Sequence, residues 1–389
     1  MTKPLVKPIR PEFSSGPCAK RPGWTVNNLE KSTLGRSHRH KASTQKLEKL
    51  IQLTKSILEI PDNYLLGIVP GSDTGALEIA LWNLLGPKHT DILVWDSFGS
   101  DWANDVINQL KLDDIKIHKT DYGRLPDLFG GDFNGDIVFN WNGTTAGVCV
   151  PNADWINSSR DGITICDATS AAFAMKIDWL KLDVTTFSWQ KCLGGEAGHG
   201  ILVLSPKAVQ RINSYKPHWP IPKLFQLKRN EELNYDIFKG STINTPSLLC
   251  VEDFLDALDW SYKIGGLSEL ILRSKKNLDI IKKWVAKSSW TDFLSEHELN
   301  ISNTSICLKL TDPRIINFPL EIKNDIEKNV IKLLEKENVA YDIGSYRSAP
   351  PGLRIWGGPT IENDDIKKLL PWLDWAYNET IEQFKHRSN

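Results

Sequence analysis

Lys191 stands between an apolar stretch and a glycine-rich loop, in the segment FSWQKCLGGEAGHGILVLS. Trp189, Cys192 and Leu193 flank it, and such neighbours are not typical of a solvated face. An ammonium group in apolar surroundings is unfavourable unless its charge is paired or removed. Condensation of the amine with an aldehyde removes that charge, so we expect imine chemistry at Lys191. The alternative is a lysine at a strand end with its ammonium group in solvent.

Asp167 closes the apolar run ITICD, and it precedes Lys191 by 24 residues. A carboxylate directly after a strand of an open α/β sheet lies at the edge where ligands bind. The spacing leaves room for one crossover, which can bring Asp167 and Lys191 to the same pocket. An amine for an imine and a carboxylate for a protonated pyridine nitrogen are the groups that pyridoxal phosphate needs. The alternative for Asp167 is a helix cap for the residues that follow.

The turn GSDTGAL, residues 71–77, joins a predicted strand to a predicted helix. The first backbone N–H groups of a helix have no internal partner, so this turn can bind a phosphate. Ser72, Asp73 and Thr74 offer side-chain caps, and a capped helix without a ligand is the alternative. The dinucleotide pattern GxGxxG and the nucleotide pattern GxxxxGK[ST] are absent here.

Short apolar runs separated by helical or loop segments predict a mostly parallel sheet covered on both faces. They cover residues 91–95, 136–140, 163–167, 184–189 and 200–205. A helix is expected over residues 43–60, with Ser43 as its cap. After residue 250, helices alternate with the strand-like pieces SICLKL, VAYDIG and GLRIWGG. We therefore expect an extended N-terminal segment over residues 1–30, a large α/β domain over 31–250 and a smaller α+β domain over 251–389.

Composition excludes several functional classes. The 389 residues carry a formal net charge of −1, so no overall basic field attracts nucleic acid or anionic lipid. No apolar run reaches 18 residues, and the N-terminus lacks the apolar core of a signal peptide. Six scattered cysteines without a CxxC pair are typical of a reducing cytoplasm. His38 and His40 lack a third ligand nearby, so no metal site is predicted.

The segment around Lys191 resembles the cofactor-lysine segment of phosphoserine aminotransferases, which belong to class V of the fold-type I, pyridoxal-phosphate-dependent aminotransferases. Further segments resemble that family in the family's order: FSSGPCAKRPGW, LGRSHRHK, VPGSDTGALEIALWNLL, WNGTTAGV, CDATSAAF, STINTPS and SYRSAPPGLRIWG. The resemblance covers nearly the whole chain. It implies a large domain with a mostly parallel seven-stranded sheet, followed by a smaller C-terminal α+β domain.

The resemblance implies that Lys191 forms the internal aldimine and that Asp167 pairs with the pyridinium nitrogen. It assigns contacts with the cofactor ring to Thr144, at the phenolic oxygen, and to Phe98, which stacks on the ring; Trp102 is the alternative stacking residue. Contacts with the cofactor phosphate fall to Asp73, Thr74, Gln190, Asn244 and Thr245. Since Asn244 and Thr245 would reach that phosphate from a second subunit, a homodimer with shared sites is expected.

Substrate recognition is also carried over from the family. His38 and Arg39 match the pair that binds the substrate phosphate from the partner subunit, and Arg354 matches the arginine that grips the α-carboxylate. The planar fork of an arginine suits bidentate carboxylate binding. Arg347 is a second candidate anion contact, and surface salt bridges are the alternative for both arginines. The chain departs from the commoner family pattern at Thr74, where an arginine is usual. This departure indicates a divergent branch of the family.

The expected reaction is reversible transamination of 3-phosphohydroxypyruvate with L-glutamate, which gives O-phospho-L-serine and 2-oxoglutarate in serine biosynthesis. Use of 4-phosphohydroxythreonine in pyridoxine biosynthesis is left open. An alternative is another class V enzyme, such as an alanine–glyoxylate or serine–pyruvate aminotransferase. A cysteine desulfurase is disfavoured because no cysteine stands in a convincing nucleophile loop. A non-catalytic, Trp-rich binding module is the remote alternative, since the chain has 15 tryptophans.

Overall fold

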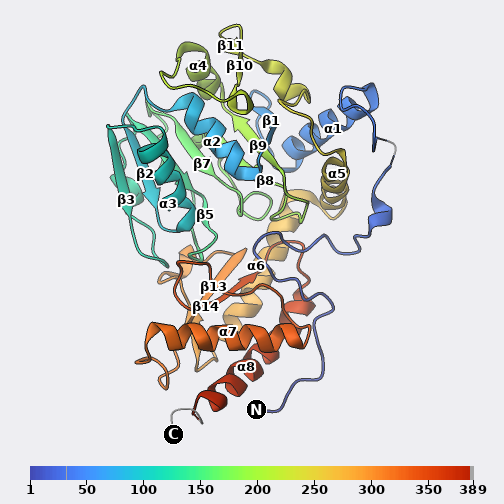
Figure 1. Ribbon diagram of the computed structural model, residues 1–389, viewed down its shortest axis with the longest axis vertical. Coiled ribbons are helices and arrows are strands. Elements are labelled where there is room, and N and C mark those ends of the chain that lie inside the picture. Colours follow the sequence, from blue (N-terminus) through green and yellow to red (C-terminus); the bar gives the residue numbers. More distant parts are fainter. Residues whose placement is uncertain (32, 386–389) are drawn as a thin grey trace.

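The computed structural model describes residues 1–31 and 33–385, and its largest element is a seven-stranded sheet (Figure 1). The strand order is β1-β9-β8-β7-β4-β2-β3, and only β9 runs antiparallel to its neighbours. The strands are β1 (Leu65–Pro70), β2 (Thr90–Val94), β3 (Ile115–Lys119), β4 (Asp136–Asn140), β7 (Thr164–Asp167), β8 (Val184–Ser188) and β9 (His199–Leu204). This confirms the predicted α/β fold with a mostly parallel sheet.

Helices cover both faces of this sheet, which explains why its central strands are continuous apolar runs. Alternate strand residues face opposite sides: Leu93 of β2 packs into one cluster, and its neighbours Ile92 and Val94 pack into the other. The first face is covered by α1 (Lys41–Ile57) and α5 (Leu248–Lys263). The second face is covered by α2 (Ser72–Leu84), α3 (Ser97–Asn104) and α4 (Pro206–Ser214).

A three-stranded antiparallel sheet lies below the first sheet in Figure 1. It consists of β12 (Thr291–Phe293), β13 (Ser305–Leu310) and β14 (Gly352–Trp356), in that order. The helices α6 (Gly266–Val285), α7 (Leu320–Lys336) and α8 (Asn363–Lys385) accompany it. Two short hairpins complete the strands: β5 (Asn142–Gly143) with β6 (Val148–Cys149), and β10 (Lys228–Arg229) with β11 (Glu232–Leu233).

Three local predictions were wrong. Helix α1 begins at Lys41 because His40, not Ser43, is its cap: the His40 Nδ1 accepts from the Ala42 N–H at 3.2 Å, and Ser43 is buried inside the helix. Ser72, Asp73 and Thr74 do not cap α2; they form its first turn, and Gly71 stands at the uncapped N-terminus.

The segment VAYDIG forms no named strand. Tyr341 makes only an isolated bridge to Glu12, and Gly344 makes one to Leu353. Its backbone groups have separate partners instead: the Tyr341 N–H donates to the Pro11 carbonyl of the N-terminal segment, the Val339 N–H donates to the Leu334 carbonyl, and the Ile343 carbonyl accepts from the Arg354 N–H. The boundary expected at residue 250 falls inside α5.

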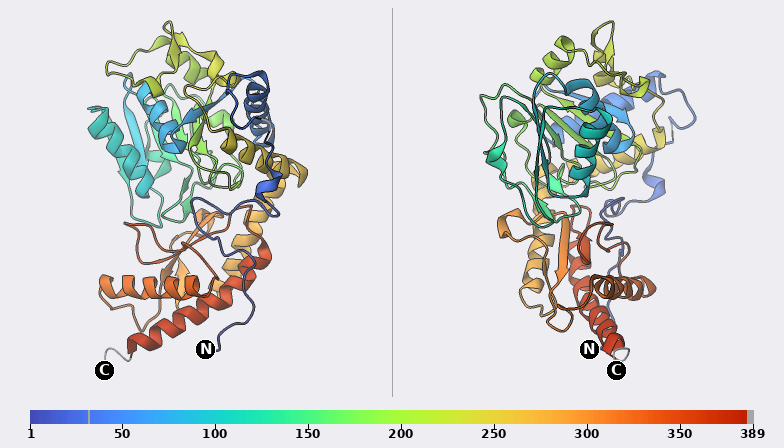
Figure 2. Two further views of the ribbon diagram at one scale, coloured as in Figure 1. Left: turned by 45° about the vertical axis from the view of Figure 1, so that its right-hand side comes forward. Right: turned by 60° about the vertical axis from the view of Figure 1, so that its left-hand side comes forward.

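The first 24 residues follow an extended path along both sheets, from a start near the C-terminal end of the described chain (Figure 2). The Val6 carbonyl accepts from the Trp372 indole at 2.8 Å, and the Phe13 carbonyl accepts from the Trp356 N–H at 3.0 Å. Further on, the Cys18 N–H donates to the Gln190 carbonyl at 2.9 Å. The segment therefore joins the small sheet to the loop that carries Lys191.

Among the residues that the structure describes, no helix is long and apolar enough to span a bilayer.

Candidate active site

A cavity of about 110 Å³ lies where strands β7 and β8 of the large sheet end. Parallel strands end at one edge of a sheet, and side chains that follow them therefore meet there. Seven residues predicted from the sequence line this cavity: Lys191, Asp167, Asp73, Thr74, Phe98, Thr144 and Gln190. Ser72, Trp102 and Thr169 complete its lining. The amine and the carboxylate singled out in the sequence therefore share one pocket.

Lys191 is held by the N-terminal segment. Its Nζ donates to the Ser15 carbonyl oxygen at 2.5 Å, and a Cβ atom on Gly16 would collide with that Nζ. Removal of the ammonium group from water lowers the pKa of Lys191, and the nearby positive charge of Arg354 adds to this effect. A lowered pKa increases the fraction of neutral amine at neutral pH, and only the neutral amine is a nucleophile and a base.

Asp167 is fixed at both carboxylate oxygens. Oδ1 accepts from the Thr169 N–H at 2.9 Å, and Oδ2 accepts from the Trp102 indole N–H at 3.2 Å. The residue is only 7% exposed, so these donors replace water around the carboxylate. An oriented, buried carboxylate of this kind suits a partner with one positive charge and a single N–H donor.

The start of α2 forms the third side of the cavity. Gly71 takes a left-handed conformation with φ of 86°, and no side chain caps the helix. The first-turn N–H groups of an uncapped helix bind anions. The Gln190 amide donates to the Ser72 hydroxyl at 2.7 Å, and its Oε1 is buried without a hydrogen-bond partner. This end of the cavity has the donors that a phosphate group requires.

Arg354 approaches the cavity from β14 of the small sheet. Its Nε is buried without a hydrogen-bond partner, and its Cζ lies 5.5 Å from the centre of the Tyr346 ring. The Tyr346 ring also lies 5.6 Å from the ring of Phe98, which lines the cavity. Tyr346 therefore connects the predicted carboxylate-binding arginine to the predicted ring-stacking residue.

Six predicted residues do not line the cavity: Arg354, described above, and five others. Arg39, Asn244, Thr245 and Arg347 are exposed, and His38 is half-buried. Asn244, Thr245, His38 and Arg39 are the residues for which the sequence predicted contact with a partner subunit's site.

Sequence reasoning missed three contacts of the site. These are the Ser15 carbonyl at Lys191, the Trp102 and Thr169 donors at Asp167, and the Tyr346 ring beside Arg354. The segment FSSGP had matched the family, but it carried no assigned role. Every residue has a main-chain oxygen, so the sequence does not indicate which of them contacts Lys191. Tyr346, in contrast, directly precedes Arg347, which the sequence analysis had selected, and could have been considered.

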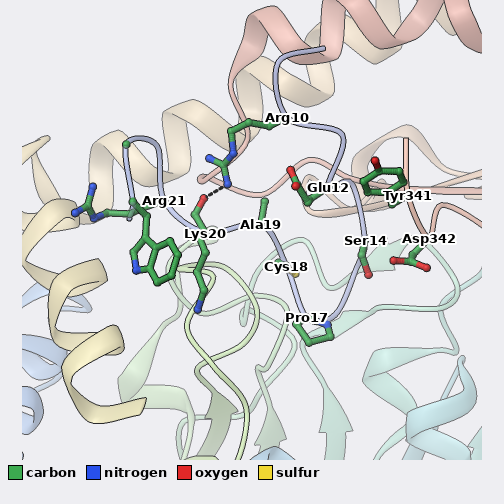
Figure 3. Close-up of a pocket in the computed structure, with 12 residues that line it drawn as sticks. Arg10, Glu12, Ser14, Pro17, Cys18, Ala19, Lys20, Arg21, Tyr341 and Asp342 are labelled. Atoms are coloured by element: carbon green, nitrogen blue, oxygen red, sulfur yellow. Dashed lines mark hydrogen bonds between the residues drawn. The ribbon is translucent and has the colours of Figure 1, made fainter. Parts of the chain in front are cut away.

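A larger cavity of about 450 Å³ lies along the N-terminal segment, lined by Ser14, Pro17 and Cys18 and faced by Tyr341 and Asp342 (Figure 3). Its lysine and one of its arginines are engaged elsewhere: Lys20 pairs with Asp253 at 2.8 Å, and Arg21 pairs with Asp256 at 2.6 Å. Burial raises the pKa of Cys18 to about 12, so its thiol stays protonated. Nucleophilic chemistry is therefore better supported in the smaller cavity at Lys191.

Comparison with known proteins identifies the family. No family model matches the chain. A relative from Methanosarcina mazei, named phosphoserine aminotransferase, is 53% identical over 376 residues, which cover 97% of this chain and 99% of the relative. The chain belongs to the phosphoserine aminotransferase family. Its members depend on pyridoxal phosphate, so the chain is a pyridoxal-phosphate-dependent transaminase, as the sequence predicted.

Solved structures confirm the fold. A phosphoserine aminotransferase from Trichomonas vaginalis with bound pyridoxal phosphate has a TM-score of 0.73 at 16% identity, over 94% of this chain and 99% of the other. An alanine–glyoxylate aminotransferase from Nostoc reaches 0.76 at 16% identity, over 97% of each chain. The two scores are alike, so shape alone does not separate these two kinds of aminotransferase. The separation rests on sequence identity.

The cavity fits the cofactor of the family. It offers an amine of lowered pKa at Lys191, an oriented carboxylate at Asp167 and an uncapped helix start for a phosphate. The side-chain N–H group of Gln190 lies at the phosphate end as well, where it donates to the Ser72 hydroxyl. These groups are those that an aldehyde, a pyridine nitrogen and a phosphate require.

Proposed function

We propose that this chain catalyses reversible transfer of an amino group between L-glutamate and 3-phosphohydroxypyruvate, with O-phospho-L-serine and 2-oxoglutarate as products. The observation that carries the proposal is the shared cavity of Lys191 and Asp167, in a chain that is 53% identical to a named phosphoserine aminotransferase. The reaction belongs to serine biosynthesis. Use of 4-phosphohydroxythreonine, which would add a role in pyridoxine biosynthesis, is part of the same proposal.

The cofactor would be held by Lys191 and Asp167 at its reactive and nitrogen ends, with the first turn of α2 and Gln190 at its phosphate. When bound, pyridoxal phosphate supplies an aldehyde that condenses with amines and a ring that accepts electrons from the substrate carbon. Asp167 would keep the ring nitrogen protonated, and Thr169 and Trp102 hold Asp167 in place. Phe98 would stack on the ring, and Thr144 would donate to its phenolic oxygen.

Lys191 acts as the proton carrier. Its lowered pKa leaves more of the amine neutral, and the neutral Nζ takes the proton from the substrate α-carbon. In the second half of the reaction, the same Nζ would deliver a proton to the α-carbon that derives from the keto acid, after that carbon has received the amino group. The Ser15 carbonyl accepts a hydrogen bond from this amine and thereby fixes the side from which it acts.

Arg354 binds the α-carboxylate that both substrates share, because its buried Nε has no hydrogen-bond partner among the residues that the structure describes. Arg347 is the second anion contact. His38 and Arg39 bind the substrate phosphate, and Asn244 and Thr245 the cofactor phosphate, each from the partner subunit of a homodimer. The proposed division into an N-terminal segment, a large domain and a small domain fits this arrangement, with Arg354 on the smaller part.

A mixing experiment tests the shared site. Subunits with Lys191→Ala are expected to be inactive, and subunits with Arg39→Ala nearly so when O-phospho-L-serine is kept well below its raised KM. When the two are refolded together, half of the dimers contain one site with both defects and one intact site. Recovery of about a quarter of wild-type turnover is expected for shared sites, and no recovery for sites built within single subunits.

Substrate choice tests the reaction. Turnover of O-phospho-L-serine with 2-oxoglutarate should exceed that of L-serine or L-alanine by several orders of magnitude, because the phosphate adds charged contacts. Equal turnover of serine or alanine with glyoxylate or pyruvate would favour the alternative, an alanine–glyoxylate or serine–pyruvate aminotransferase.

The six free cysteines fit the cytoplasmic location that we propose for the enzyme.

A further inference from the structure

Asp73 has a carboxyl group for which the family pattern gives no role beyond its backbone. It stands in the first turn of α2, is only 6% exposed and lines the same cavity as Asp167. Its Oδ1 is buried without a hydrogen-bond partner. A buried acid with an unpartnered oxygen, placed beside the carboxylate that is proposed to hold the cofactor, needs a physical explanation.

The surroundings of Asp73 are polar but offer no nearby cation. Asp167 lies beside it on β7, and the buried hydroxyls of Thr169 and Thr186 are close enough to lower its pKa. Lys191 is the one cationic residue in the described lining of the cavity, and its Nζ is engaged by the Ser15 carbonyl. Nothing in this set neutralises a second negative charge beside Asp167.

Two carboxyl groups in one buried cavity do not both ionise at neutral pH. Burial raises the pKa of Asp73 well above its usual range, and the charge of Asp167 raises it further. Asp167 receives two N–H donors, which stabilise its ionised form, and no N–H group donates to Asp73 Oδ1. The hydroxyls of Thr169 and Thr186 lower the pKa of Asp73, but burial and the charge of Asp167 are the larger effects. Asp73 is therefore the member of the pair that keeps the proton.

We propose that Asp73 is a protonated positioning residue, whose carboxyl O–H donates to Asp167 and completes the set of donors around that carboxylate. The inference rests on the proposed function, in which Asp167 holds the ring nitrogen of the cofactor. A neutral Asp73 leaves the pair with one negative charge, which matches the single positive charge of a protonated pyridine. An ionised Asp73 would place a second negative charge there with no counterpart.

Infrared spectroscopy of the holoenzyme tests the protonation state directly. At neutral pH, the difference spectrum between wild type and Asp73→Asn should show the C=O stretch of one protonated carboxyl group, which the variant lacks. Asp96→Asn is the matched control: burial raises the pKa of Asp96 only to about 6, so that acid is mostly ionised at neutral pH. Loss of carboxylate bands instead of the carboxyl band in Asp73→Asn would overturn the proposal.

Cofactor affinity gives a second measurement. Asp73→Ala removes the donor and should weaken binding of pyridoxal phosphate about tenfold, as expected for one hydrogen bond to a charged group. Asp73→Asn keeps an N–H donor and should recover most of that affinity. Equal weakening in both variants would contradict the proposal. The infrared measurement does not depend on turnover. Absence of phosphoserine turnover in the wild type would therefore refute the proposed function, while the infrared spectrum would still test whether Asp73 is protonated.

Discussion

The indole N–H of Trp102 donates a hydrogen bond to Asp167 Oδ2 at 3.2 Å. Trp102→Phe keeps an aromatic ring in the cavity but removes this donor. We expect pyridoxal phosphate to bind about tenfold more weakly, because a hydrogen bond to a charged group contributes about 1.5–3 kcal/mol. Titration of the apoenzyme, followed by the absorbance of bound cofactor, measures the effect. Unchanged affinity would show that the remaining donors are sufficient to hold Asp167.

Lys191→Ala should abolish turnover, because the chain then lacks both the covalent attachment point and the proton carrier. The visible absorbance of the attached cofactor should disappear with it. Lys191→Arg is the matched control, since it keeps a positive charge but not a neutral amine at neutral pH. Turnover with normal absorbance in either variant would refute the assignment of Lys191.

Arg39→Ala and Arg354→Ala should differ in which substrate they affect. Loss of Arg39 should raise KM for O-phospho-L-serine at least tenfold and leave KM for glutamate nearly unchanged, because only the first substrate carries a phosphate. Loss of Arg354 should raise KM for both, because both carry an α-carboxylate. Steady-state kinetics with each substrate separate the two cases. Equal effects of Arg39→Ala on both substrates would argue against a phosphate contact.

Asp96 should make the protein less stable as pH rises. It caps α3 through the Gly99 N–H, and burial raises its pKa from 3.8 to about 6. The folded state therefore holds a proton that the unfolded state releases, so the free energy of unfolding falls by up to about 3 kcal/mol between pH 4 and pH 7. Urea unfolding across this range should show that Asp96→Asn lacks this contribution. Parallel curves for the two proteins would contradict it.

His199 should act in the opposite direction. Its ring stacks on Trp189 at 4.5 Å, its Nε2 accepts from the Ser247 N–H at 3.1 Å, and burial lowers its pKa from 6.5 to about 4. The folded state excludes a proton that the unfolded state binds. Stability is therefore fully present above pH 6.5 and is lost, by up to about 3 kcal/mol, as pH falls toward 4. His199→Gln should show a smaller loss in the same urea experiments; an unchanged loss would place the acid sensitivity elsewhere.

Much of the fold and of the cavity was predictable because its signals are local. The apolar runs that end at Asp167 and beside Lys191 are long enough to mark buried strands, and parallel strands end at one edge of the sheet. Family resemblance then supplied Thr144 and Gln190, which also line the cavity. The placement of these residues follows from the order of strands and helices along the chain, and that order can be read from the sequence.

The contacts that sequence reasoning missed depend on distant segments. Ser15 meets Lys191 across 176 positions through a main-chain oxygen, which carries no residue-specific signal. The cap at His40 was missed because a histidine nitrogen rarely serves where a serine stands nearby in the sequence. The residues from Val339 to Gly344 have the sequence pattern of a strand, but their backbone bonds to several different segments, including Pro11 of the N-terminal segment.

The path of that segment also bears on how the chain folds. The Val6 carbonyl accepts a hydrogen bond from Trp372, 366 positions further along the chain, and the Ser15 carbonyl accepts one from Lys191 across 176 positions. Contacts between distant positions form slowly, because the entropy lost on closing a long loop must be overcome before the contact contributes. We therefore expect this segment to dock late in folding, after the helices and hairpins that depend on near neighbours.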